Sequence, residues 1–398
     1  MSGDIDFTMP DNRDEAISLL SKMFPQETQA IQKYFNLIEK LSNEFFRLSK
    51  ASWWEYALFP FIFRNILHYR TTSVKQALDK MMHDNTLKLL LNTNVGYYND
   101  TIKDFSFFYH AIAQHSYFEG GGWYIKGGSS NLSNYLASII EKNGGEIITK
   151  ANVIKIEHKD KQTHAISYMH KKEKKELQSD LIISNIDPSS TYKLANIDYQ
   201  EKKKVATSLL SMYIGFKTNI KSVYGKRAYS TFLMPNITSI EAYDTHIQED
   251  LTNRAIVFVD YSQVDSALTE DPSKSFGVIC TTDYLEDWEH LDKEAYTQKK
   301  QEITESYLDR LETQYPNIRE HIEFTEIGTA KTMQRYLKTP NGTAYGFAPY
   351  NDQFFRIPEI KSKKLNNLYF VGAWVISGGF TPAILSGDMC YQKIIKEK

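Results

Sequence analysis

The last thirty residues of the chain constrain its fold most strongly. A short apolar strand over Leu368–Val371 runs into a loop that holds Gly372, Gly378 and Gly379, and an amphipathic helix follows from about Thr381. Glycine lets backbone approach a ligand closely or adopt a positive φ, and a helix start presents free N–H groups and a partial positive charge. The segment therefore suits an electron-rich ligand. An ordinary strand–loop–helix with a glycine-rich turn explains this stretch alone equally well.

A second glycine-rich segment lies at Tyr117–Leu136, YFEGGGWYIKGGSSNLSNYL, and leads into another helix. Apolar residues recur there at helical spacing, and Gly144 and Gly145 end the helix. Strands are predicted next at Gly145–Thr149 and Asn152–Glu157. Residues 145–185 as a whole predict a three-stranded meander with a charged, solvated hairpin turn.

Four segments, in this order, resemble the FAD-dependent phytoene desaturase, carotenoid isomerase and retinol saturase (all-trans-retinol 13,14-reductase) superfamily. The Tyr117–Leu136 stretch is similar to the family's GG-x-(Y/F)-P-x-GG stretch, with Ile125 where the family usually has proline. Asp180–Pro188 (DLIISNIDP) is similar to the strand that re-enters the FAD domain. Thr332–Ala348 (TMQRYLKTPNGTAYGFA) is similar to the stretch beside the isoalloxazine, and the C-terminal segment is similar to the flavin-facing one.

The resemblance spans essentially the whole chain and implies an α/β fold. We expect an FAD/NAD(P)-binding-type (Rossmann-like) domain made of discontinuous segments and incomplete at the N-terminus, with an inserted α+β substrate lobe. The implied division is a trailing strand at 1–10, a mainly helical substrate-lobe segment at 11–118, an FAD-domain helix and meander at 119–190, a substrate-lobe sheet with helices at 191–340, and a C-terminal flavin-facing segment at 341–398.

One part of the family pattern is absent from the sequence. No G-x-G-x-x-G turn occurs in it, and that turn seats the FAD pyrophosphate on a helix N-terminus. We therefore expect an N-terminally truncated or split member that by itself binds FAD weakly or not at all. An N-terminal Rossmann fragment acting in trans is the implied protein partner.

The resemblance also assigns site residues. Backbone at Val153 would hold the adenine edge, and no metal ligands are implied. Glu119, Lys126 and Tyr345 are candidate acids for catalysis, although each singly is more simply explained as a bond within its own loop. The positions implied to bind the cofactor are Val153, Asn185, Gly372, Gly378, Gly379, Phe380 and Thr381.

The implied function is FAD-dependent oxidation, reduction or isomerisation at C–C and C=C bonds of a polyene lipid, carotenoid or retinoid-like. One alternative is a non-catalytic remnant that binds an apolar ligand and has lost FAD. Another is an amine-oxidase-like flavoenzyme, whose usual flavin-site pattern differs from GGFTPAILSG. The sequence does not reveal the polyene or the redox direction.

Composition adds few constraints. The net charge of −2 gives no reason to expect a nucleic-acid partner. Only Cys280 and Cys390 are present, so a reducing compartment fits, and we predict a cytoplasmic protein that is either free or peripheral to a membrane.

The stretch Trp53–Tyr69 contains seven aromatic residues in seventeen positions. Such a segment could enter one leaflet of a membrane, or it could be core of the substrate lobe kinked at Pro60. We favour core, because the segment has no strongly basic face.

Periodicity predicts the remaining elements. Residues 12–115 are expected to be mainly helical, with one helix over Ser73–Asn92. Strands are expected at Leu209–Phe216, Ala255–Asp260 and Phe276–Thr282, and an exposed charged helix at Lys293–Leu311.

Overall fold

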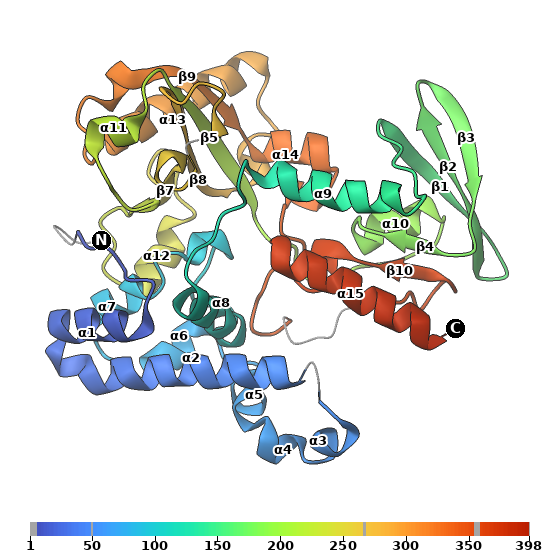
Figure 1. Ribbon diagram of the computed structural model, residues 1–398, viewed down its shortest axis with the longest axis horizontal. Coiled ribbons are helices and arrows are strands. Elements are labelled where there is room, and N and C mark those ends of the chain that lie inside the picture. The colour runs from blue at the N-terminus through green and yellow to red at the C-terminus, as the bar shows by residue number, and fades with distance from the viewer. Residues whose placement is uncertain (1–5, 49–50, 266–267, 354–358, 398) are drawn as a thin grey trace. The chain divides into compact units, whose positions relative to one another are not determined.

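The computed structural model describes residues 6–48, 51–265, 268–353 and 359–397. The chain divides into two compact units, each assembled from segments that are far apart in sequence (Figure 1). The first unit contains residues 1–124, 209–329 and 349–355. The second unit contains residues 125–208, 330–348 and 356–398.

The N-terminal half of the first unit is helical, as predicted. The side chain of Asn12 accepts hydrogen bonds from two N–H groups of the first helix, which is why that helix begins there. The buried face of the second helix contains Ile31, Tyr34 and Ile38, and the Tyr34 hydroxyl meets His110 Nε2 at 2.8 Å in the core. The helices are α1 (Arg13–Met23), α2 (Thr28–Leu48), α3 (Trp53–Ala57), α4 (Phe59–Ile62), α5 (Arg64–Tyr69), α6 (Val74–Asp79), α7 (Asn85–Leu90) and α8 (Phe107–Gly120).

The single helix predicted over Ser73–Asn92 is wrong, because the chain forms α6 and α7 instead. Asp84 caps α7 by accepting the N–H of Leu87 at 2.9 Å. Glu27, from a segment nearly sixty residues earlier, accepts the N–H groups of His83 and Asp84 at 2.6 and 2.7 Å. These carboxylates satisfy the backbone donors that a continuous helix would have used, so the break is stable.

The aromatic stretch departs most from expectation. It forms three short helices, and most of its large side chains face solvent: Trp53 is 83% exposed and Phe61 79% exposed. Only Phe63 and Ile66 are fully buried. The prediction of buried core is therefore wrong for α3 and α4. Figure 1 shows α3 and α4 at the margin of the first unit, with α5 between them and α2.

The second half of the first unit is a five-stranded sheet, and the three predicted strands are confirmed. Helix α13 is mostly exposed and turns Ile303, Tyr307 and Leu311 into the core. The strands, in spatial order, are β6 (Ser230–Leu233), β7 (Ile256–Asp260), β8 (Ser275–Asp283), β5 (Ser208–Phe216) and β9 (Ile322–Gly328). The helices are α11 (Ile220–Tyr224), α12 (Ile240–His246) and α13 (Lys293–Glu312).

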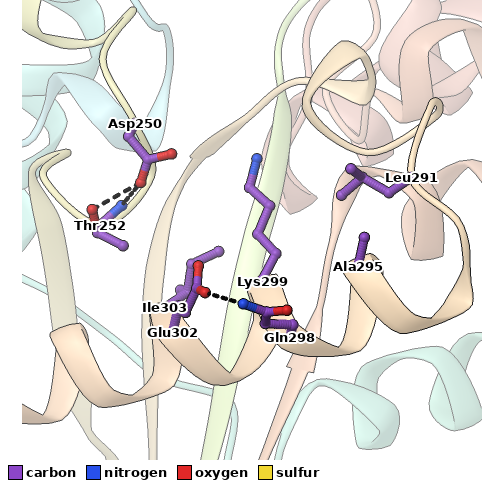
Figure 2. Close-up of a pocket in the computed structure, with 8 residues that line it drawn as sticks. All are labelled: Asp250, Thr252, Leu291, Ala295, Gln298, Lys299, Glu302 and Ile303. Atoms are coloured by element: carbon purple, nitrogen blue, oxygen red, sulfur yellow. Dashed lines mark hydrogen bonds between the residues drawn. The ribbon is translucent and has the colours of Figure 1, made fainter.

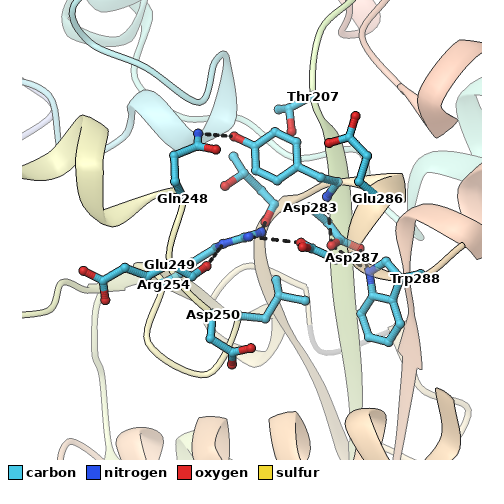
Figure 3. Close-up of polar contacts among 12 residues, drawn as sticks. Thr207, Gln248, Glu249, Asp250, Arg254, Asp283, Glu286, Asp287 and Trp288 are labelled. Carbon is cyan, nitrogen blue, oxygen red and sulfur yellow. Dashed lines mark hydrogen bonds and ion pairs between the residues drawn. The ribbon is translucent and has the colours of Figure 1, made fainter. Parts of the chain in front are cut away.

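A buried polar network fixes the end of β8 (Figure 3). The Arg254 guanidinium is almost fully buried and donates to Asp287 at 3.0 Å and to the carbonyl of Glu249 at 2.9 Å. Asp283 accepts the indole N–H of Trp288 at 2.8 Å. Because these buried groups bond to one another, the network stabilises this part of the fold.

The second unit contains the predicted meander and a two-stranded parallel sheet. The meander is β1 (Ala151–Lys159), β2 (Gln162–His170) and β3 (Glu173–Gln178), and the parallel pair is β4 (Ile182–Ser184) with β10 (Leu368–Phe370). The helices are α9 (Ser129–Lys142), α10 (Pro188–Leu194), α14 (Ala330–Leu337) and α15 (Phe380–Glu397).

Two smaller strand predictions fail. Gly145–Thr149 is not a strand, because the N–H of Gly145 bonds the carbonyl of Ile140 and so closes the end of α9. Residues 6–10 have no regular structure, and residues 1–5 lie outside the described part of the chain. Across the described residues, no helix is both long and apolar enough to cross a bilayer.

Candidate functional site

The two parallel strands of the second unit bring Asn185 against Gly372. Phe370 pairs with Ser184, and the N–H of Val371 donates to the carbonyl of Ser184 at 2.9 Å. Asn185 follows Ser184 at the end of β4, and Gly372 follows Val371 at the end of β10. Gly372 has φ +84°, and a Cβ there would lie 1.7 Å from Asn185 Oδ1. Both the backbone conformation and the neighbouring amide exclude a side chain at this position.

Ser386 fastens helix α15 to this loop. Its side chain is completely buried, and its Oγ accepts the N–H of Gly372 at 2.7 Å and donates to the carbonyl of Ala383 at 2.6 Å. Ser386 was not among the predicted residues. The sequence signal for Ser386 is its place as a small polar residue about two turns into an amphipathic helix that follows a glycine-rich segment.

Tyr345 lies directly on Gly378. A Cβ at Gly378 would be 2.2 Å from Tyr345 Cδ1 and 2.7 Å from its Cα. One residue further, Gly346 has φ +79°, and its Cβ would lie 2.3 Å from the carbonyl of Ala373. The backbone around Tyr345 thus runs in close contact with the loop after β10, and this contact requires glycine on both sides. Gly346 lies within the Thr332–Ala348 segment, where the sequence pattern alone assigns it no role.

Gly379 differs from the other loop glycines. Its φ is +97°, yet a Cβ there would meet only Pro382 Cδ, at 3.7 Å. Phe380 and Thr381 follow at the start of α15, and both are exposed. By helix geometry their N–H groups have no intrahelical acceptor, and the first intrahelical bond is that of Ala383 to Gly379, at 3.3 Å. The space beside the Gly379 backbone is therefore open, and Gly379 directly precedes a helix N-terminus with its partial positive charge.

The other predicted residues make local contacts of their own. Val153 is exposed on β1, opposite Tyr168 at a β-bulge. Lys126 is exposed in the turn before α9, and its carbonyl accepts the side-chain N–H of Asn131 at 2.9 Å. Glu119 belongs to α8 of the first unit, where its carboxylate lies 3.3 Å from Nε2 of His115. The structure thus places Asn185 and Tyr345 against the segment that leads from β10 into α15 and contains Gly372, Gly378, Gly379, Phe380 and Thr381. We call these seven residues together the glycine loop.

The far end of α15 is also fastened. Glu397 accepts hydrogen bonds from Lys361 Nζ at 2.6 Å and from the Tyr369 hydroxyl at 2.7 Å. The Lys361 hydrogen bond, with that of Tyr369, lowers the pKa of Glu397 to about 2. Since Tyr369 lies on β10, the helix is bonded at its start through Ser386 and at its end through Glu397.

The second unit exposes an unusual amount of apolar surface. None of the residues of α9 is buried, and its Tyr135 is 63% exposed. Ile183 of β4 is half exposed, and within the described chain β4 pairs only with β10. Parallel sheets ordinarily have both faces covered, and a pair of strands alone is marginal. Further exposed apolar residues of α9 and α15 are Leu136, Ile139, Ile140, Phe380, Ile384, Leu385 and Met389.

The first unit has an open pocket beside α13 with a volume of about 330 Å³ (Figure 2). Its polar residues are engaged locally. Gln298 donates to Glu302 at 2.9 Å, and Thr252 donates to Asp250 from both its N–H and its hydroxyl. None of the predicted site residues lines it. The glycine loop of the second unit is therefore the candidate site.

Comparison with known proteins identifies the class. The chain belongs to the family of flavin-containing amine oxidoreductases, whose model matches residues 7–395. It is 26% identical to all-trans-retinol 13,14-reductase of Danio rerio, over 94% of this chain and 67% of that protein. It is 25% identical to the chloroplastic prolycopene isomerase 1 of an Oncidium hybrid cultivar, over 98% of this chain and 69% of that protein.

A solved structure supports the fold. An oxidoreductase from Methanosarcina mazei superposes with a TM-score of 0.50 at 15% identity, covering 87% of this chain and 74% of its own. The predicted superfamily and the α/β FAD-binding fold are thus confirmed. FAD is the cofactor of the family. One observation fits a flavin at the glycine loop: Asn185 and Tyr345 fill the space beside Gly372 and Gly378, whereas the space beside Gly379 is open.

Proposed function

We propose that this protein is an FAD-dependent oxidoreductase of the phytoene desaturase and retinol saturase type. Its substrate would be a polyene lipid, carotenoid or retinoid-like, and the reaction a saturation, desaturation or isomerisation. The observation that carries the proposal is the open backbone at Gly379 before α15. Support for the substrate class comes from the relatives, which are named for retinol and prolycopene.

The chain's own residues have distinct proposed roles. FAD, when bound, supplies the hydride chemistry. The N–H groups of Phe380 and Thr381, with the N-terminus of α15, would favour negative charge on the ring, worth about 0.3–2 kcal/mol. Among the candidate acids, Tyr345 is the one on the glycine loop, so we propose it as the proton donor. Glu119 and Lys126 remain candidates, and Val153 and Asn185 remain proposed cofactor contacts.

We further propose that a strand–turn–helix segment completes the flavin site, either in the same polypeptide or in trans. Among the described residues β4 pairs only with β10, so its other edge would accept a parallel strand, and the exposed faces of α9 and α15 would accept an amphipathic helix. Such a segment would carry the glycine-rich turn that seats the pyrophosphate. Its docking would cover the apolar surface that the second unit exposes.

The experiment compares the 398-residue chain alone with the chain co-expressed with a strand–turn–helix segment that carries a G-x-G-x-x-G turn. We expect a colourless protein alone and a flavin spectrum in the complex. The complex is then assayed anaerobically with retinoid and carotenoid polyenes, and aerobically with amines for hydrogen peroxide. Turnover of amines only would favour an amine oxidase. A folded complex that stays colourless in excess FAD would favour a non-catalytic apolar-ligand protein.

A further inference from the structure

The outer surface of α3 and α4 has an unusual composition. Residues 53–62, which we call the aromatic tip, expose a group of large apolar side chains within a few turns of helix: Trp53, Trp54, Tyr56, Leu58 and Phe61. An exposed apolar group of this density marks an interaction surface, because single exposed apolar residues are normally scattered. Tryptophan and tyrosine are the residues that favour the boundary between water and lipid acyl chains.

The aromatic tip is held in place by hydrogen bonds. Glu55 accepts the N–H and hydroxyl of Ser52, both at 2.9 Å, and Arg47 of α2 donates to the same carboxylate at 2.8 Å. Glu44 of α2 accepts the N–H of Ile66 at 2.9 Å. Phe63 and Ile66, which follow the tip in sequence, are fully buried in the core. The exposed aromatics are therefore presented by an ordered scaffold.

Charge indicates what covers this surface. The whole chain has a net charge of −2, yet residues 44–70 carry four cations, Arg47, Lys50, Arg64 and Arg70, and two acids, Glu44 and Glu55. Glu55 is already paired with Arg47, Glu44 is bonded to Asn65 and Ile66, and Arg64 and Arg70 are exposed. The cations flank the aromatic tip in sequence and form no strongly basic face, but a second copy of this chain would still bring like charges together, which is unfavourable. An anionic lipid surface would be attracted by the cations and would bury the aromatics.

We propose that the aromatic tip docks the protein on the interfacial layer of an anionic phospholipid bilayer, with Trp53, Trp54 and Phe61 inserted and Arg64 and Arg70 near the headgroups. The attachment is peripheral. The inference stands on the first unit alone and does not rest on the proposed function.

The test uses the full chain in flotation with vesicles of phosphatidylcholine and phosphatidylglycerol at 3:1, and with pure phosphatidylcholine vesicles. We expect the wild type to float with the anionic vesicles. Trp53→Ser with Trp54→Ser should lower the partition coefficient at least ~tenfold, since two large aromatics lose their apolar environment. Arg64→Glu with Arg70→Glu should lower binding to anionic vesicles by roughly fivefold or more for each cation removed.

Trp123→Ser is the matched control, because Trp123 is 91% exposed but lies outside the tip. It should float like the wild type, and all variants should melt at the wild-type temperature. Tryptophan emission should shift to shorter wavelength with vesicles in Trp123→Ser but not in the Trp53/Trp54 double variant. Wild-type flotation by the double variant, or no flotation of the wild type, would overturn the proposal. If the wild type instead forms a dimer that the double variant loses, a second copy covers the tip.

Discussion

Ser386 Oγ lies 2.7 Å from the backbone nitrogen of Gly372 and accepts its hydrogen bond inside the second unit. This bond joins the loop after β10 to the helix whose N-terminus forms the candidate flavin site. The glycine loop is thus positioned by a residue that has no contact with solvent.

Replacing Ser386 by Ala should therefore destabilise the protein. The N–H of Gly372 would be left buried without its acceptor, which costs about 1–3 kcal/mol. Urea denaturation of Ser386→Ala measures this loss. Ser133→Ala, on the exposed face of α9, is the matched control and should change stability by no more than ~0.5 kcal/mol. Equal stability of the two variants would show that the Ser386 bond contributes nothing.

A second prediction concerns Gly372 and Asn185. Gly372→Ala should cost at least ~2 kcal/mol, because the backbone has φ +84° and the new Cβ would meet Asn185 Oδ1. Adding Asn185→Ala should recover part of this loss, since it removes the collision but not the backbone strain. Denaturant melts of the two single variants and the double variant give the coupling free energy between positions 185 and 372. Strict additivity would mean that the two side chains do not meet.

The ion pair at the end of α15 makes a pH prediction. The pKa of Glu397 is lowered in the folded protein, so its stabilising effect is complete above the unfolded pKa, near 4.5, and is lost as pH falls through about 2. The melting temperature of the wild type should exceed that of Glu397→Gln at pH 7. This difference should shrink steadily between pH 4.5 and pH 2. A constant difference over that range would exclude the assigned pairing with Lys361 and Tyr369.

Hydrogen exchange tests the docking surface on the second unit. In the chain alone, amides of β4 and α9 should exchange fast, because α9 has no buried residue and β4 has one partner strand within the part of the chain that the structure describes. Co-expression with the G-x-G-x-x-G segment should slow exchange in these two elements and in α15. The five-stranded sheet of the first unit serves as the internal reference. Protection of the first unit alone would place the segment elsewhere.

The sequence predicted elements whose signal is local. Short apolar, strand-like runs predicted β5, β7 and β8, and the apolar spacing of α9 with its terminal glycines predicted that helix. The break between α6 and α7 could not be foreseen, because Glu27 creates it from a distant helix. The exposure of Trp53 was equally hidden, since a run of aromatics does not reveal whether any other element packs against it. Within the site, glycine spacing found Gly372 and Gly378, whereas Asn185 and Tyr345 came from resemblance. The hydrogen bond from Gly372 to Ser386 is visible only in the three-dimensional structure.

The most direct test of the flavin-site assignment is the flavin content of Gly379→Val. Measured by absorbance in the complex with the G-x-G-x-x-G segment, this variant should lose FAD or show a lowered reduction potential. A side chain there would enter the open space before α15 at a backbone with φ +97°. Gly225→Val, at an exposed position of the first unit with φ +75° and no described atom within 4 Å of an added Cβ, controls for the added bulk and should keep both properties. Glu119→Gln and Lys126→Met should also retain flavin and change only turnover. Wild-type flavin content and potential in Gly379→Val would contradict the assignment of the glycine loop as the flavin site.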